Sequence, residues 1–158
     1  MNKLLGILVL FAVMASSVLA TDLTLNPDLT TMAPTDVKVV DACIVKSSGG
    51  PYVGVALAVT TYCQDLNNNE VCDGADVMFP GTFSAVVTST PTDVTGCGKV
   101  TLTTTGASGQ YVYRVNGQDA GVEVAAESGL VLVPEFTTVG AGLALAGAGL
   151  YMNRKRRK

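Results

Sequence analysis

A dense group of oxygen-donating residues lies just after Cys63. Counted from its first member as position 1, side-chain oxygens recur at positions 1, 3, 5, 9 and 12, and the main-chain carbonyl at position 7 adds another; the residues are Asp65, Asn67, Asn69, Val71, Asp73 and Asp76. In a tightly coiled loop such positions turn toward a common centre, and calcium takes six to eight hard oxygen ligands. The spacing therefore predicts a calcium site in this loop.

The spacing is that of an EF-hand-type loop, with two departures. Glu70 stands at position 6, where the sharp turn prefers glycine, and Asp76 stands at position 12, where glutamate reaches further. No helical period flanks the loop, so it resembles the calcium loops of dockerin-like and other extracellular modules, which implies weak binding. The alternative is a polar turn, closed by a disulfide, in which Asp and Asn serve turn chemistry.

All four cysteines lie in the central part of the chain, and an even number predicts disulfides in an exported domain. Four cysteines allow three connectivities. Cys63 and Cys72 are nine positions apart and flank the loop, so their pairing is favoured. That pairing leaves Cys43 with Cys97. A tetra-cysteine zinc site is disfavoured, because the sequence has no C-x-x-C pair and no histidine.

The absence of histidine excludes a Ser-His-Asp catalytic triad. A pair of loop carboxylates for glycoside hydrolysis is the remaining catalytic option. Four acids on one short loop are more typical of cation ligands, and no tryptophan is present to line a sugar cleft. Tyr111 and Tyr113 alternate along a predicted strand, and we expect them to pack on a β face rather than to form a carbohydrate platform. We therefore expect a protein that is not an enzyme.

Apolar residues alternate with a period of two through much of the central region, which predicts β-strands. Asn116-Gly117 follows one such run and predicts a hairpin turn. No segment between residues 21 and 134 has a helical period. About seven short strands in a region of this length predict an all-β, Ig-like β-sandwich. The expected strands cover residues 37–46, 53–60, 82–88, 100–104, 111–115, 121–125 and 130–133.

Several of these strands carry recognisable motifs. They are Cys43-Ile44-Val45-Lys46 before a Gly-Gly-Pro turn, Val53-Gly54-Val55, Gly81-Thr82-Phe83-Ser84, and residues 92–96, 99–103 and 109–113. Together, over residues 36–124, they resemble a bacterial Ig-like domain of the invasin and intimin type. The resemblance implies an extracellular structural or adhesive module and brings no catalytic residues. The insertion between Tyr62 and Gly81, which contains the candidate calcium loop, departs from the pattern.

Residues 1–20 have the three-part layout of a secretory signal peptide. Lys3 precedes an apolar run from Leu4 to Met14, and Val18 and Ala20 stand at the positions that a signal peptidase inspects. The alternative is an N-terminal membrane anchor that is never cleaved.

At the other end, residues 137–152 carry no charge and are followed by five basic residues, 154–158. This pattern predicts a short transmembrane helix of about 24 Å with a cytoplasmic tail, since a helix rises about 1.5 Å per residue. Residues 21–134 would then lie outside the membrane.

Pro134-Glu135-Phe136, the apolar span and the basic end together resemble the PEF-CTERM sorting signal of archaeal surface proteins, over residues 134–158. The resemblance implies recognition by an archaeosortase, a membrane transpeptidase that removes the tail. Two alternatives remain open. The span is a permanent anchor, or its many Gly and Ala residues let helices pack closely in the membrane.

Of the 13 acidic residues 12 fall within residues 21–134, but only four of the 10 basic residues do, so the net charge there is 4 − 12 = −8. An acidic domain excludes nucleic acid as a partner and favours cation binding. We therefore expect an exported, membrane-anchored structural or adhesive protein of the cell surface. The alternative is a surface binding module for a polysaccharide or another envelope protein.

Overall fold

The computed structural model describes residues 21–134. The expected signal peptide at 1–20, Glu135 and Phe136 of the sorting motif, the span at 137–152 and the basic tail lie outside the described residues, and Pro134 is the last residue within them. In the described part, no helix has the length and apolar character needed to cross a membrane.

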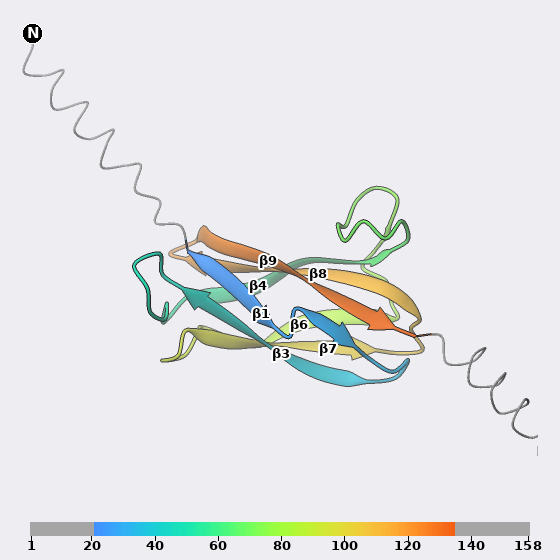
Figure 1. Ribbon diagram of the computed structural model, residues 1–158, viewed down its shortest axis with the longest axis horizontal. Coiled ribbons are helices and arrows are strands. Elements are labelled where there is room, and N and C mark those ends of the chain that lie inside the picture. Colours follow the sequence, from blue (N-terminus) through green and yellow to red (C-terminus); the bar gives the residue numbers. More distant parts are fainter. Residues whose placement is uncertain (1–20, 135–158) are drawn as a thin grey trace, which may run out of the picture.

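The described residues form two stacked β-sheets, as the alternating pattern predicts (Figure 1). Sheet A has the strand order β1-β3-β7-β6, and sheet B has the order β2-β9-β8-β4-β5. The strands are β1 Asp22–Asn26, β2 Leu29–Thr31, β3 Val37–Val45, β4 Ala56–Asp65, β5 Val77–Met78, β6 Phe83–Ser89, β7 Cys97–Thr104, β8 Gly109–Asp119 and β9 Val122–Val133.

The chain changes sheets near its start. β1 pairs antiparallel with the second half of β3 in sheet A, and after Asn26 the chain crosses to sheet B, where β2 pairs parallel with β9. The other strand pairs in the described residues are antiparallel. β1 leaves sheet A at Asn26. Within the described residues, the first half of β3 is therefore paired with β7 along one edge and has no strand along its other edge.

The core lies between the sheets and follows from the period-two pattern. Val40, Ala42 and Ile44 of β3 are fully buried in the core from sheet A, and Tyr111 and Tyr113 of β8 contribute to the same core from sheet B, with 1% and 0% exposure. The expectation that both tyrosines pack on a β face is confirmed. Phe83 stacks on Tyr111, with ring centroids 4.9 Å apart.

The predicted turn at Asn116-Gly117 is wrong, because both residues lie inside β8. A Cβ on Gly117 would overlap Cδ1 of Ile44, so the glycine makes room for the opposite sheet. The hairpin instead turns at Ala120 and Gly121, whose φ angles of 48° and 81° are both positive, as a type I′ turn requires.

Other strand boundaries also differ from the prediction. The two strands expected at 121–125 and 130–133 are one continuous strand, β9. The strand expected at 53–60 begins at Ala56 and continues to Asp65. The sequence pattern does not predict β1, β2 and β5; each is short, and β1 and β2 alternate buried with exposed residues over five and three residues only.

Candidate functional site

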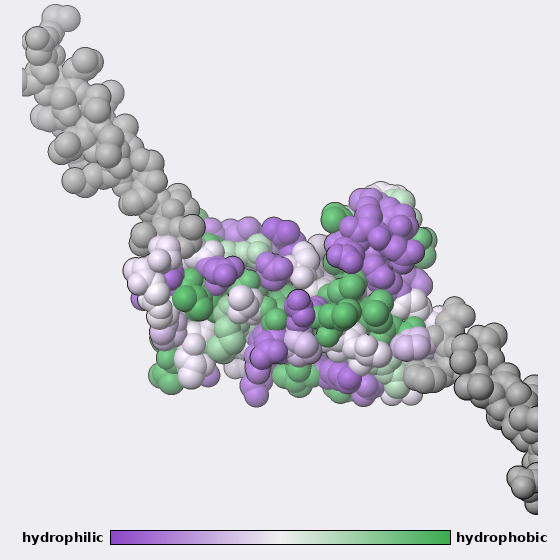
Figure 2. Space-filling model, in the orientation of Figure 1, coloured by the Kyte–Doolittle hydropathy of each residue, from purple (hydrophilic) through white to green (hydrophobic). Residues whose placement is uncertain are grey.

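The candidate calcium loop, residues 66–76, connects β4 to β5 at the edge of sheet B. Figure 1 shows it as the green loop that projects from one corner of the sandwich, and Figure 2 shows that its surface is strongly hydrophilic. β5 returns along β4, with Cys63 opposite Met78 and Gln64 opposite Val77, so the two ends of the loop are held together.

The disulfide Cys63–Cys72 ties this loop to sheet B, and the predicted pairing is confirmed. Cys63 is completely buried and lies opposite Val112 of β8. The sulfur of Cys72 lies 3.8 Å from the carbonyl oxygen of Val112. The loop therefore folds back over the outer face of the sheet.

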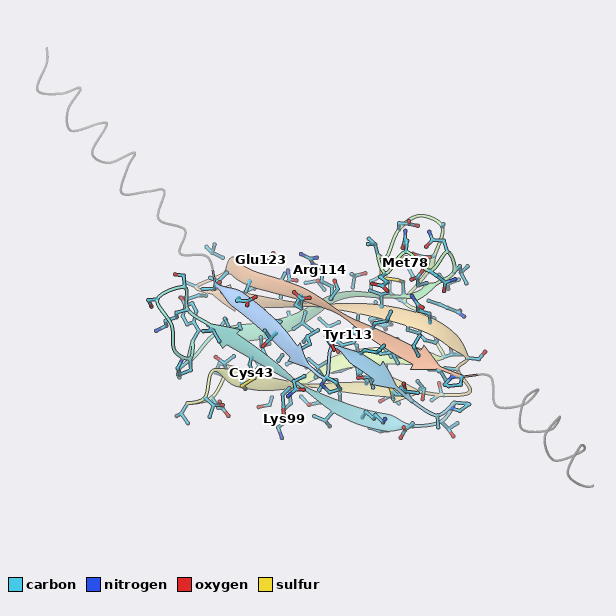
Figure 3. All side chains as sticks on the ribbon, in the orientation of Figure 1. Cys43, Met78, Lys99, Tyr113, Arg114 and Glu123 are labelled. Atoms are coloured by element: carbon cyan, nitrogen blue, oxygen red, sulfur yellow. A yellow bond between two sulfur atoms is a disulfide. The ribbon has the colours of Figure 1, made fainter. Side chains whose placement is uncertain are left out.

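The second predicted disulfide, Cys43–Cys97, is also confirmed. It joins residues that face each other directly across β3 and β7 in sheet A (Figure 3). No cysteine in the described part of the chain is free.

Asp65 closes the base of the loop and is only 4% exposed. Its carboxylate accepts hydrogen bonds from the main-chain N–H of Glu70 at 2.9 Å and of Asn69 at 3.3 Å. The side-chain amide of Gln110, from the neighbouring strand β8, donates a third bond at 2.8 Å. These donors anchor position 1 of the predicted ligand set to the sheet.

Asp73 and the two asparagines lie together in the loop. One carboxylate oxygen of Asp73 accepts hydrogen bonds from the side-chain amides of Asn69 at 2.8 Å and Asn67 at 3.3 Å. The other accepts from the main-chain N–H of Ala75 at 2.7 Å. The bond from Ala75, followed by that from Asn69, lowers the pKa of the Asp73 carboxyl group, because hydrogen bonds favour the charged form.

Asp76, at position 12, links the two ends of the loop. Its carboxylate accepts from the N–H groups of Leu66 at 3.0 Å and Asp73 at 2.9 Å. The side-chain oxygens of Asn67 and Asn69 accept from main-chain N–H groups two residues later, at 3.1 and 3.0 Å. The predicted side-chain ligands are thus gathered in one compact loop and held by the loop's own donors.

The main chain makes the sharp turn that this type of loop requires. Glu70, at position 6, has a φ of 62°, and Asn68 has a φ of 56°. Glycine adopts this left-handed conformation without strain, whereas glutamate does not. The loop therefore keeps the turn although its sequence lacks the glycine.

Among residues 21–134, no group of three or more His, Cys, Asp or Glu side chains is arranged to hold a metal ion. The carboxylates of Asp65, Asp73 and Asp76 each accept hydrogen bonds from N–H donors, which a cation would have to replace. The carbonyl of Val71 completes the predicted ligand set. Calcium binding by these residues stays a prediction.

Sequence reasoning missed Gln110 as a partner of this loop. It lies 45 positions from Asp65, and only the pairing of β4 with β8 places the two opposite each other. A polar residue next to a predicted strand carries no local signal of such a contact.

No family model and no curated protein matches the chain. Similar solved structures include domains 4 and 5 of the S-layer protein SbsC, with a TM-score of 0.47 and 12% identity over 71% of this chain. Another is the adhesin InvE of Yersinia pseudotuberculosis, with a TM-score of 0.40 and 17% identity over 72% of this chain. The matched regions cover 50% and 26% of those two chains, so this chain spans half or less of their length.

Proposed function

We propose that the protein is exported and serves as a structural or adhesive module of the cell surface. The observation that carries this proposal is that all four cysteines form disulfides within one β-sandwich. Disulfides persist in oxidising, extracytoplasmic compartments and are rare in the cytosol. The signal-like residues 1–20 and the acidic character of residues 21–134 support the same location.

The tail from Pro134 to Lys158 then serves as a sorting signal for an archaeosortase-type enzyme. Mass spectrometry of the protein recovered from the envelope tests this part of the proposal. A C-terminus close to Pro134, with the span and the basic tail missing, is the expected result. A peptide that retains residues 154–158 would replace the sorting signal with a lasting membrane anchor.

The loop at 66–76 serves in this proposal as a calcium-stabilised corner of the sandwich. Its support is the spacing of Asp65, Asp73 and Asp76 along one compact loop whose ends are held together by β5 and by a disulfide. We expect a dissociation constant in the range of extracellular modules, about 0.1 to 1 mM. Calcium that binds only the folded state would stabilise it by about 1.5 to 3 kcal/mol at roughly 10 to 100 times that constant.

Thermal melting of the protein with calcium, with magnesium and with a chelator tests the loop. We expect calcium alone to raise the melting temperature, and Asp76→Asn to remove the increase. Asp93→Asn is the matched control, because Asp93 also accepts main-chain N–H groups but lies in a different turn, with Thr95 and Cys97 as its donors. Equal melting temperatures in calcium and chelator would leave the loop as a polar turn.

A further inference from the structure

A wide groove lies where the chain changes sheets, away from the candidate calcium loop. It has a volume of about 460 Å³ and runs between β2 and the beginning of β3, lined by Pro27, β2 and Val37–Val39. It lies on the side of β3 that β1 leaves uncovered. The hydrogen-bonding pattern of β2 and β3 shows which main-chain N–H and C=O groups face this groove.

β3 bonds to β7 through its even-numbered positions. The N–H of Thr104 donates to the carbonyl of Asp36 at 3.0 Å, and the N–H of Ile44 donates to the carbonyl of Gly96 at 2.9 Å. In an antiparallel pair, alternate residues exchange hydrogen bonds with one neighbour, and the residues between them face the other side. The odd-numbered residues of β3 therefore point their N–H and C=O groups away from β7.

β1 pairs with the odd-numbered residues of β3 only from Asp41 to Val45. Val37 and Val39 have no strand beside them on that side within residues 21–134. The N–H of Val37 is satisfied by the Asp36 carboxylate at 2.8 Å. The carbonyl of Val37 and both main-chain groups of Val39 remain open to the groove.

β2 presents a second open edge to the same groove. Its even-numbered positions bond to β9, since the carbonyl of Asp28 accepts from that strand and the N–H of Met32 donates to it. Leu29 and Thr31 therefore face away from β9. The carbonyl of Thr31 accepts a hydrogen bond from the ammonium group of Lys38, which spans the groove.

The groove also contains one polar side chain without a partner and several apolar side chains. The hydroxyl of Thr30 is buried, with the residue only 3% exposed, and it has no hydrogen-bond partner among residues 21–134. Leu29, Val37 and Val39 are about half exposed.

We propose that this groove binds an extended segment of a partner protein, which adds to β3 as a strand in line with β1. Open N–H and C=O groups on a strand edge are matched by the main chain of another strand. Among the described residues that line the groove, Lys38 is the one that carries a charge, and a carboxylate is a stronger acceptor for it than a carbonyl. The segment therefore carries an acidic residue opposite Lys38 and apolar residues opposite Val37 and Val39.

The proposal rests on the exported, cell-surface location proposed above in one respect, namely that a partner is met outside the cell. It needs neither calcium nor cleavage of the tail. If no peptide strand binds, the calcium-melting and mass-spectrometry results are unaffected. If calcium does not bind, or the tail is retained, the test of strand addition is likewise unaffected.

Hydrogen exchange by NMR on the full-length protein in detergent tests the open edge directly. We expect the amide of Val39 to exchange at least tenfold faster than that of Val40, which bonds to β7. The probe for strand addition is the peptide acetyl-TVEVT-amide, whose valines would lie opposite Val37 and Val39. Its binding should slow exchange at Val39 without changing exchange in β8.

Three comparisons make the test specific. The peptide acetyl-TVKVT-amide should bind about fivefold more weakly than acetyl-TVEVT-amide. Lys38→Gln should remove this preference for the glutamate peptide. The matched variant Lys46→Gln should keep it. Val39→Pro removes the open N–H and should abolish binding. Should that variant fail to fold, N-methylation of the peptide valines gives the same test on the unaltered protein. Binding that survives N-methylation, or no slowing of Val39 exchange by either peptide, would overturn the proposal.

Discussion

Tyr113 is the largest side chain in the described core whose polar group has no partner. Its hydroxyl is buried without a hydrogen bond, and Figure 3 shows it between the two sheets, near the crossover from β1 to β2. Gly129 lies opposite it in β9, where a Cβ would overlap the ring. Burial raises the pKa of Tyr113, with a smaller contribution from the charge of Asp28.

Replacing Tyr113 with phenylalanine keeps the ring and removes the unpartnered hydroxyl. We expect Tyr113→Phe to raise the free energy of unfolding by about 1 kcal/mol at neutral pH. The raised pKa means that the folded state disfavours ionisation of the Tyr113 hydroxyl. The free energy of unfolding is therefore unaffected by this group below the unfolded pKa of about 10, and it falls as the pH rises above that value. The variant should therefore lose less stability above pH 10 in urea denaturation.

Tyr111→Phe is the control for this variant, because the Tyr111 hydroxyl donates to the carbonyl of Ser108 at 3.0 Å. That change should destabilise the protein by about 1 kcal/mol. If both variants are destabilised equally, the Tyr113 hydroxyl has a partner that the described residues do not include.

Glu70 is the residue of the candidate loop whose type fits its conformation least well. Its φ of 62° costs an ordinary residue about 1–2 kcal/mol relative to the right-handed region. We expect Glu70→Gly to stabilise the protein by about 1 kcal/mol in thermal melting, with or without calcium. Asn68→Gly should have a smaller effect, since asparagine tolerates its similar φ of 56°. A loss of stability in Glu70→Gly would show that the glutamate side chain itself stabilises the loop.

At the scale of elements, the close approach of β6 and β4 to β7 depends on one glycine. Gly98 of β7 is buried, and a Cβ there would overlap the carbonyl oxygen of Ser89 and lie 2.5 Å from Cδ1 of Leu57. β6 changes its register against β7 between Val87 and Ser89, which brings its main chain to this position. The packing of β6 and β4 over the end of β7 therefore depends on the missing side chain.

We expect Gly98→Ala to destabilise the protein by about 3 kcal/mol, because the main chain of β6 must move to accommodate the methyl group. Gly74→Ala is the matched control: no atom lies within 4 Å of the added carbon, and its φ needs no glycine. Chemical denaturation measures both. A Gly98→Ala protein as stable as the control would mean that the end of β6 shifts freely.

At the scale of the whole molecule, the two disulfides differ in what they constrain. Cys43–Cys97 joins residues 54 positions apart in two strands of sheet A, whereas Cys63–Cys72 spans nine positions and closes the projecting loop. In the chain-entropy model the longer closed segment contributes more, about 4 kcal/mol against about 3 kcal/mol.

Replacing both cysteines of each pair with alanine should separate these roles. We expect loss of Cys43–Cys97 to lower the global free energy of unfolding by about 4 kcal/mol in urea denaturation. Loss of Cys63–Cys72 should mainly expose residues 66–76 to limited proteolysis, since both sheets keep their other contacts. The prediction fails if proteolysis of the two variants begins at the same site.

Much of this protein follows from the sequence by itself. The period-two pattern predicts an all-β domain, because alternate residues of a strand must face the core, and even the strand at 37–46 is predicted to within one residue. The cysteine spacing favours both disulfides, because two cysteines nine positions apart that flank a turn pair easily, and this pairing leaves Cys43 with Cys97. The oxygen spacing at 65–76 predicts a calcium loop; in the described residues this loop is compact, but no three of its acidic side chains are placed to hold a metal ion, so the calcium site stays a prediction.

The tertiary structure decided what depends on partners distant in the chain. Asn116-Gly117 has the local signal of a turn, yet the opposing Ile44 needs the space of Gly117, so the strand continues and the turn forms at Ala120-Gly121. Gln110 reaches Asp65 only through the pairing of β8 with β4. The open edge at Val39 exists because β1 leaves sheet A at Asn26, and no pattern within either strand records where its neighbour ends.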